Sequence, residues 1–376
     1  MISILCREMP RNWQEGFLID RMKINIEDAI RSIPYYPRAM KYGGDDGLVR
    51  LASNENPFPP SQGIINAVLD AVFSITRYPG SELELKQLIG ERYGLTHEQV
   101  VLGNGSDEII EMVLKAARLK GKDRVVITEP AFAYYSIASQ VFGYEVVKVP
   151  LRDMRTDLEA IKEAIDERTR IIFLNNPLNP TGTIFRDGEF REFLKDLPPD
   201  VIVANDEAYA EFAEDKDFPY SMRFIEEYPV LILRTFSKAY ALAGLRIGYC
   251  LGEASLISFL ERTRQPFSIN SVALAASKAA LADRDFLRFV LENNRKGKAF
   301  YYRAFEELSL DYVSTEANFI LVRLGRDAEA ITKRLFEEGI LVRWMGAYNL
   351  PDYIRVTIGK TDENTRFIDA LRKILG

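Results

Sequence analysis

The sequence contains a single histidine, two cysteines and no long apolar run among its 376 residues. Because His97 stands alone, a histidine-based catalytic triad and a zinc site of clustered histidines are both excluded. Cys6 and Cys250 lie far apart without the spacing of metal ligands, and we expect two free thiols in a reducing cytoplasm. Acid–base chemistry must therefore use other groups, and no metal site is predicted.

Basic clusters and membrane-spanning segments are also missing. The formal net charge is −6 and the basic residues are interspersed with acidic ones, so no nucleic-acid partner is expected. No apolar run approaches the roughly 20 residues of a membrane span, and no basic stretch followed by an apolar core opens the chain. We expect a cytoplasmic protein without a membrane partner, in which residues 1–21, ahead of Met22, are an extension that carries no chemistry.

Short apolar runs recur through the middle of the chain. They lack the strict alternation of half-exposed strands and are typical of strands covered on both faces; they span 124–128, 145–149, 170–175, 201–206, 230–235 and 246–251. Helical patterns such as 157–167 and 190–197 lie between them. This alternation predicts an α/β fold with a mostly parallel sheet, and ligands bind at the carboxyl ends of such strands.

The pattern changes near residue 275, where long helical stretches give way to short strands. A chain of this length is expected to form two domains. We expect a large domain over residues 49–274 and a smaller α/β domain over 275–376. Residues 1–48 are too few to fold alone, so the small domain is predicted to be built from both chain ends.

One lysine stands in an unusual setting. Lys238 lies in TFSKAYALAGLRIGY, among small and apolar residues directly after an apolar run, although lysine is seldom buried. Arg246 follows eight residues later and is expected to open the next strand, where it can form either an ordinary ion pair or a bidentate contact with a phosphate. Asp206 ends the run VIVAND and can serve a metal, a ribose or a pyridinium nitrogen, with Tyr209 three residues later.

Three further stretches offer partners for the parts of one cofactor. In GNGSDEII, a glycine-rich segment enters a helix at Ser106 and Asp107, which predicts either an anion site or a simple helix cap. Asn179 in NNPLNPTG is either a turn former or a ligand contact, and Phe132 in EPAFAYY is either a cover for an aromatic cofactor or core. Together these features describe pyridoxal 5′-phosphate, with Lys238 as the reactive amine.

The motifs NPLNPTG, NDEAY and SKAYALAGLRIGY resemble those of fold-type I aminotransferases, in matching order from about residue 30 onward. The stretches LASNENPFPPS, RYPG, GNGSDEII and the early PYYP resemble the histidinol-phosphate aminotransferase branch. Threonine-phosphate decarboxylases and some aromatic aminotransferases share parts of this pattern. The resemblance implies a fold-type I pyridoxal-phosphate transferase that works as a homodimer.

The resemblance also implies roles for individual residues. Catalysis falls to Lys238, Asp206 and Tyr209. The cofactor is contacted by these three and by Ser106, Asp107, Phe132, Asn179, Ser237, Arg246 and, from the neighbouring subunit, Tyr78. Substrate contacts are expected from Tyr35, Asn179, Arg343 and Arg355. Many relatives carry tyrosine where Phe132 stands, so a phenol hydrogen bond is absent here while stacking is retained.

The expected reaction is transamination between L-histidinol phosphate and 2-oxoglutarate, which gives imidazole-acetol phosphate and glutamate in histidine biosynthesis. A guanidinium suits the carboxylate of glutamate and the phosphate of histidinol phosphate equally, which assigns Arg355, assisted by Arg343, to both anions. Aromatic amino acid transamination and threonine-phosphate decarboxylation on the same scaffold remain alternatives. A non-enzymatic regulator would need a DNA-binding module, and no basic helix-turn-helix pattern is present.

Overall fold

The computed structural model describes residues 28–36 and 47–376, so the predicted extension at 1–21 lies outside the described residues. Its centre is a seven-stranded sheet in the order β2-β8-β7-β6-β5-β3-β4. These strands are β2 (Val100–Gly103), β8 (Gly248–Leu251), β7 (Val230–Thr235), β6 (Ile202–Asp206), β5 (Thr169–Asn175), β3 (Arg124–Glu129) and β4 (Glu145–Pro150). Strand β8 runs antiparallel to β2 and β7 on either side, and the remaining pairs are parallel, which confirms the predicted mostly parallel α/β sheet.

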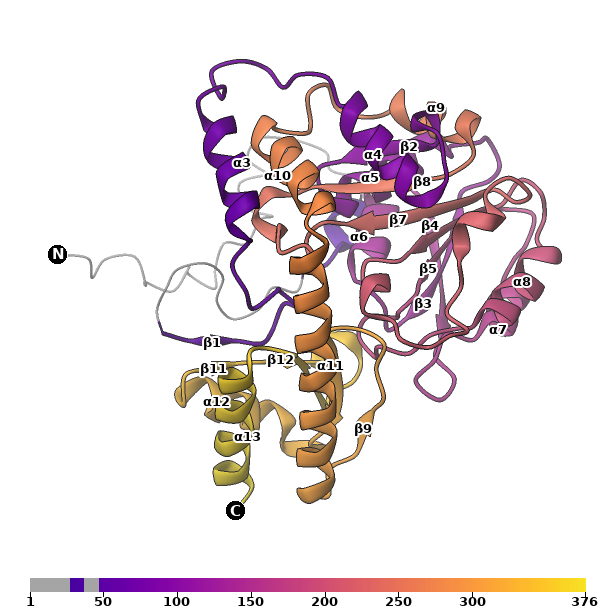
Figure 1. The fold of residues 1–376 in the computed structure, drawn as a ribbon. Coiled ribbons are helices and arrows are strands. Elements are labelled where there is room, and N and C mark those ends of the chain that lie inside the picture. The colour runs from indigo at the N-terminus through magenta and orange to yellow at the C-terminus, as the bar shows by residue number, and fades with distance from the viewer. Residues whose placement is uncertain (1–27, 37–46) are drawn as a thin grey trace, which may run out of the picture.

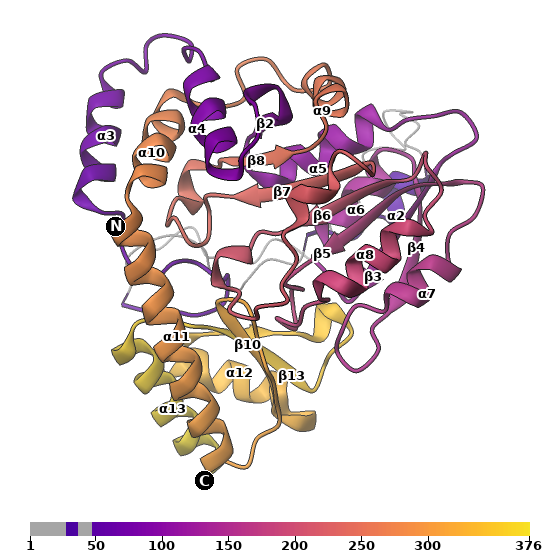
Figure 2. The same cartoon turned by 45° about the vertical axis from the view of Figure 1, so that its right-hand side comes forward.

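Helices cover both faces of this sheet, which explains why its central strands are apolar on both sides (Figures 1 and 2). One core contains side chains of α5 (Gly105–Ala116), α6 (Tyr134–Val141) and α9 (Ala254–Glu261). The opposite core contains side chains of α3 (Gln62–Val72), α4 (Leu83–Tyr93), α7 (Leu158–Glu163), α8 (Asp187–Lys195) and α10 (Ser271–Ala282). Successive residues of each strand alternate between the two cores.

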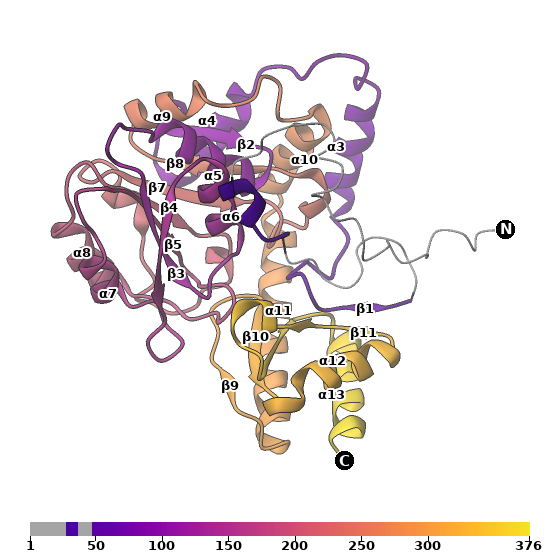
Figure 3. The ribbon, with the colours of Figure 1, turned by 180° about the vertical axis from the view of Figure 1, so that it is seen from behind.

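A smaller body lies beside the carboxyl ends of the parallel strands (Figures 1 and 3). Its antiparallel sheet has the order β12-β13-β10-β9, formed by β12 (Arg343–Trp344), β13 (Tyr353–Thr357), β10 (Phe319–Arg323) and β9 (Tyr312–Val313). Its helices are α11 (Arg284–Glu307), α12 (Ala328–Glu337) and α13 (Thr361–Leu375). The long helix α11 connects the two bodies, and its apolar residues near the C-terminal end pack in the small core.

The packing shifts the predicted domain limits. Strand β1 (Val49–Arg50) pairs in parallel with β11 (Ile340–Leu341), and Val49 and Leu51 belong to the small core, so the large body begins after them rather than at 49. Helix α10 packs on α3, which moves the second limit from 275 to the junction with α11. The sequence shows where the helices become longer, but tertiary packing decides which of the two bodies each helix joins.

The described part of the N-terminal segment also differs from its prediction. Helix α2 (Asp28–Ser32) lies against α6 of the large body, not against the small body that residues 1–48 were expected to join (Figure 3). Short 3-10 turns occur at His97–Gln99, Ala210–Phe212, Ser221–Phe224, Ala243–Leu245, Gly325–Asp327 and Gly346–Tyr348. Over the described ranges, no helix combines the length and the apolar character that crossing a membrane requires.

Candidate active site

A cavity of about 430 Å³ opens where the carboxyl ends of the parallel strands meet the small body. The chain places there almost every residue that the sequence singled out, because β5, β6 and β7 all deliver their following loops to this edge. The predicted residues that line it are Ser106, Asp107, Phe132, Asn179, Asp206, Tyr209, Ser237, Lys238, Arg246, Arg343 and Arg355.

Lys238 follows β7 and points its amine into this cavity. Nζ donates a hydrogen bond to the Ser53 carbonyl oxygen at 3.1 Å and lies 5.8 Å from the centre of the Tyr209 ring. Burial, followed by the positive charge of Arg355, lowers the pKa of Lys238 from its ordinary 10.5 to about 8. About a tenth of the amine is therefore unprotonated at pH 7, far more than at the ordinary pKa, as a nucleophile or base requires.

Asp206 ends β6 with only 3% of its surface exposed. Its Oδ2 accepts a hydrogen bond from the Tyr135 hydroxyl at 2.6 Å, and its Oδ1 accepts one from the Ala208 N–H at 3.0 Å. Burial raises the pKa of Asp206 to about 6, against the opposing effect of the Tyr135 hydrogen bond. No ion pair reaches this carboxylate from the described residues, so it is available to a cationic ring nitrogen.

The start of α5 and Arg246 form a cradle for an anion. Gly105 has φ 74°, a left-handed conformation that side chains rarely adopt, and a Cβ there would lie 2.5 Å from Nη2 of Arg246, so the guanidinium would have to shift. Arg246 pairs with Asp107 at 3.0 Å, while the Ser106 and Ser237 side chains line the same end of the cavity. Free N–H groups of the first turn of α5 complete a site that suits a phosphate.

The backbone of Arg246 corrects one prediction. This residue has a left-handed conformation, φ 52° and ψ 64°, and closes a 3-10 turn two residues before β8 begins, rather than opening that strand. The left-handed conformation is uncommon outside glycine and cannot be inferred from an apolar run.

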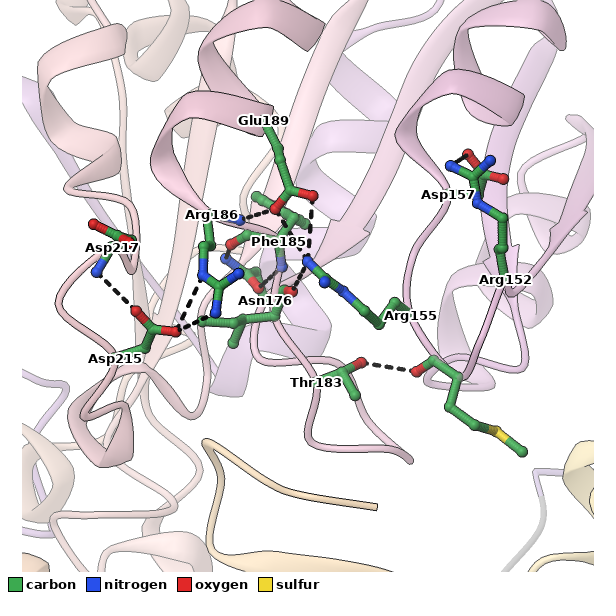
Figure 4. A network of polar contacts seen from close by, with 12 residues as sticks. Arg152, Arg155, Asp157, Asn176, Thr183, Phe185, Arg186, Glu189, Asp215 and Asp217 are labelled. Carbon is green, nitrogen blue, oxygen red and sulfur yellow. Dashed lines mark hydrogen bonds and ion pairs between the residues drawn. The ribbon is translucent and has the colours of Figure 1, made fainter.

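The asparagines of NNPLNPTG divide into structural and cavity-facing members. The Asn176 side chain exchanges two hydrogen bonds of 3.1 Å with the backbone of Phe185 (Figure 4). Asn175 accepts from the Asn179 N–H at 2.8 Å. Behind them, Arg155 donates to the Ile184 carbonyl at 3.0 Å and also contacts Glu189. This network fixes the turn, so that Asn179 faces the cavity.

On the small-body side, Asn179 meets a buried arginine. Arg355 donates from Nη1 to Asn179 Oδ1 and from Nη2 to the Ala52 carbonyl at 2.9 Å. Arg343 of β12 lies opposite Arg355 of β13 in the strand register, so two guanidinium groups line one wall of the cavity. Burial lowers the pKa of Arg355, and its Nε has no hydrogen-bond partner within the described residues. This wall suits an anionic substrate group.

Several cavity residues were not predicted. Asn54 donates to the Tyr209 hydroxyl at 2.9 Å, and Tyr36, Tyr135 and Tyr348 complete the aromatic lining. The stretch LASNENPFPPS, which contains Asn54, was recognised as a motif without a role for each residue. The tyrosines carry no local signal that separates a cavity wall from core.

Two predicted residues lie outside the cavity. Tyr35 is 86% exposed, and its neighbour Tyr36 takes the lining position instead, 6.1 Å from Phe132 between ring centres. Tyr78 is 78% exposed and stacks on Phe267 at 4.5 Å. Tyr35 thus lies outside the cavity that Tyr36 lines, and the contact predicted for Tyr78 concerns a second subunit, so both roles stay predictions.

The residues that line the cavity have the chemical groups that pyridoxal phosphate requires. A buried carboxylate without an ion-pair partner among the described residues, an amine of lowered pKa, an anion cradle at Gly105 and Arg246, and the ring of Phe132 stand around one cavity. The fold and this site together define a pyridoxal-phosphate enzyme.

The comparison with known families identifies the class of enzyme. The family model described as "Aminotransferase class I and II" matches residues 46–371, and the chain belongs to this family of pyridoxal-phosphate-dependent aminotransferases. The chain is 46% identical to histidinol-phosphate aminotransferase 2 of Pseudomonas fluorescens, over 87% of this chain and 89% of the relative. It is 42% identical to histidinol-phosphate aminotransferase 1 of Cupriavidus pinatubonensis, over 93% of this chain and 94% of the relative.

A solved structure supports the same assignment. The histidinol-phosphate aminotransferase of Sinorhizobium meliloti, in complex with pyridoxal 5′-phosphate, superposes with a TM-score of 0.84 at 27% identity. The match covers 93% of this chain and 98% of that structure. The predicted fold class, cofactor and aminotransferase activity are thereby confirmed.

Proposed function

We propose that this aminotransferase transfers the amino group of L-histidinol phosphate to 2-oxoglutarate, which yields imidazole-acetol phosphate and glutamate in histidine biosynthesis. Relatives at 36–46% identity carry the corresponding name. The observation that carries the proposal is the wall formed by Arg343 and Arg355, because one substrate presents a carboxylate and the other a phosphate. Two adjacent guanidinium groups bind either anion with paired hydrogen bonds.

We assign the chain's own groups as follows. Lys238 moves a proton at the substrate α-carbon, since its lowered pKa allows the amine to accept and return one near neutral pH. Asp206 holds the proton of the ring nitrogen, while Asn179 and Tyr209 bind the ring oxygen and Phe132 covers the ring. The bound cofactor supplies an electron-accepting ring that stabilises the negative charge left at the α-carbon.

The remaining contacts complete the proposed site. The phosphate of the cofactor is held by the cavity residues Ser106, Asp107, Ser237 and Arg246 of one subunit. Tyr78 of the other subunit completes this set. The substrate lies between Tyr36 and the arginine wall, with Tyr348 closing the small-body side.

Half-reactions with single amino donors test the proposed substrate. L-Histidinol phosphate and L-glutamate are each expected to convert the cofactor's absorption band to that of its amine form, and at comparable rates. L-Phenylalanine and L-threonine phosphate serve as comparison donors. A faster conversion by phenylalanine would identify an aromatic aminotransferase, and release of carbon dioxide from threonine phosphate would identify a decarboxylase.

A second test concerns the shared anion wall. Arg355→Lys keeps the charge but loses the fork, so we expect kcat/KM to fall by about 10², or roughly 2.7 kcal/mol, in both half-reactions. The absorption spectrum of the bound cofactor should be unchanged. A defect confined to the glutamate half-reaction contradicts the shared role and weakens the assignment of histidinol phosphate.

We also infer that the enzyme is a cytoplasmic homodimer. Large apolar side chains are exposed on and after α3, with Leu69 at 55%, Phe73 at 89% and Ile75 at 63%, and they continue to Tyr78 and Phe267. Such a patch suits a second copy of the chain. Sedimentation should give a dimer, and mixing Lys238→Ala with Tyr78→Phe subunits should restore activity through one intact site per hybrid. Full activity in a monomer contradicts this inference.

A further inference from the structure

Tyr135 occupies the first turn of α6 and is fully buried, yet its hydroxyl reaches the cavity. Its ring stacks on Phe173 with 5.2 Å between centres and an interplanar angle of 5°. The edge of a second ring, that of Phe132, meets it at 5.4 Å and 83°. Two aromatic neighbours therefore fix the ring, and the hydroxyl has one direction available, toward Oδ2 of Asp206 at 2.6 Å.

The direction of this hydrogen bond follows from the surroundings. Burial and the charge of Asp206 hold the pKa of Tyr135 well above its ordinary value, so the phenol keeps its proton and donates. The Ala208 N–H occupies Oδ1, and both oxygens of Asp206 thus accept from neutral donors. Such donors favour an ionised carboxylate but leave its charge uncompensated.

We propose that Tyr135 is a positioning residue: through its hydrogen bond to Asp206 it keeps that carboxylate ionised and aimed at the ring nitrogen of the bound cofactor. The proposal rests on the pairing of Asp206 with that nitrogen, which belongs to the proposed function. Without the phenol, the buried carboxyl group would retain the shared proton more readily, and the ring nitrogen would lose its charge. Tyr135 thereby contributes to the electron-accepting power of the ring without contacting the substrate.

Tyr135→Phe isolates the hydroxyl, since phenylalanine preserves the two ring contacts. Tyr144→Phe is a matched control: Tyr144 is buried in the same core and donates to the Leu114 carbonyl at 2.9 Å, outside the cavity. Both apoenzymes should unfold at similar temperatures. Each is titrated with pyridoxal phosphate and with its analogue in which a C–H group replaces the ring nitrogen, and binding is followed by protein fluorescence.

The expected result is selective. Tyr135→Phe should weaken binding of pyridoxal phosphate by about 10-fold or more, as for a hydrogen bond to a charged group, and leave the analogue unaffected. In the reconstituted enzyme kcat should fall while KM changes little, because the substrate contacts are intact. Tyr144→Phe should match the wild type with both compounds.

The other outcomes distinguish a failure of the role of Tyr135 from a failure of the pairing between Asp206 and the ring nitrogen. Equal weakening of both compounds, or no weakening, overturns the role of Tyr135 and leaves the proposed function standing. A wild-type apoenzyme that binds both compounds equally, and for which Asp206→Asn changes neither affinity, contradicts the pairing of Asp206 with the ring nitrogen itself.

Discussion

Asp206 and Glu207 are neighbours at the end of β6, yet they lie on opposite faces of the sheet and in opposite electrostatic settings. Glu207 pairs with Arg234 at 2.7 Å and accepts from Asn205 at 3.0 Å. Within the part of the chain that the structure describes, Asp206 receives only neutral donors. Both are almost wholly buried, so burial alone does not distinguish a structural charge from a functional one. The two kinds of charge differ in whether the protein itself supplies a counter-ion.

Two buried arginines show the same contrast. Burial acts to lower the pKa of Arg234, but electrostatic interactions outweigh it and hold that pKa well above its usual range; the largest is with Glu211, followed by Tyr93, Tyr249 and Glu207. Burial lowers the pKa of Arg355, and its hydrogen-bond partners among the described residues, Asn179 and the Ala52 carbonyl, are neutral. A buried charge without a compensating partner is costly, and it persists where a ligand supplies the missing charge.

The largest effect is expected at the uncompensated carboxylate. Asp206→Asn keeps the shape and one acceptor but removes the charge, so kcat should fall by about 10³-fold through loss of electrostatic stabilisation at the ring. The free energy of unfolding should change little, because no ion pair is broken. Steady-state kinetics and urea unfolding measure the two quantities. A large loss of stability with retained kcat would reverse the assigned roles.

Glu207→Gln should show the opposite pattern. The substitution leaves Arg234 buried with Glu211 alone, and breaking a buried pair in this way should cost about 3 kcal/mol of unfolding free energy. In the folded fraction, kcat should remain close to that of the wild type, because this pair lies on the far face of β6. The comparison fails if Glu207→Gln lowers kcat as strongly as Asp206→Asn does.

The sequence predicted this contrast only in part. Asp206 and Lys238 were identified because Asp206 ends a strongly apolar strand and Lys238 follows one, each within a recognisable motif. The partnership of Asp206 with Tyr135 joins side chains 71 positions apart, and nothing local to either residue encodes it. The separation of Asn175 and Asn176 from Asn179 likewise depends on which amide faces inward in the folded turn.

Six of the seven strands of the large sheet were predicted to within two residues at each end, because a run buried on both faces leaves a continuous apolar signal, whereas β2 was not predicted. The boundaries between the bodies were not, since α10 and β1 are defined by the surface on which they pack. Tyr35 and Tyr36 cannot be told apart from the sequence, because both carry the same local signal. Only tertiary geometry decides that the Tyr36 ring lines the cavity.

The smallest effect is expected from Lys238, whose charge is disfavoured in the folded apoenzyme. The unfolded chain holds this proton up to its ordinary pKa of 10.5, whereas the folded chain releases it near pH 8. Between these values the unfolded state binds more protons, so stability rises with pH across this window. Below pH 8 both states are protonated, and the full penalty of burying the ammonium remains.

Lys238→Met removes the charge while retaining an unbranched side chain. At pH 7 the apoenzyme of the variant should be more stable than the wild type by about 2 kcal/mol, after allowance for partial exposure. The difference should shrink as the pH rises from 8 to 10.5. Arg355, Glu55, Arg246 and Asp107, which act on the Lys238 charge, are common to both proteins, so their own titrations largely cancel in the comparison. Urea unfolding at stepped pH measures the difference.

A difference that stays constant from pH 7 to pH 10.5 would mean that the folded apoenzyme accommodates the ammonium without cost, and Lys238 would then belong with the compensated charges such as Arg234.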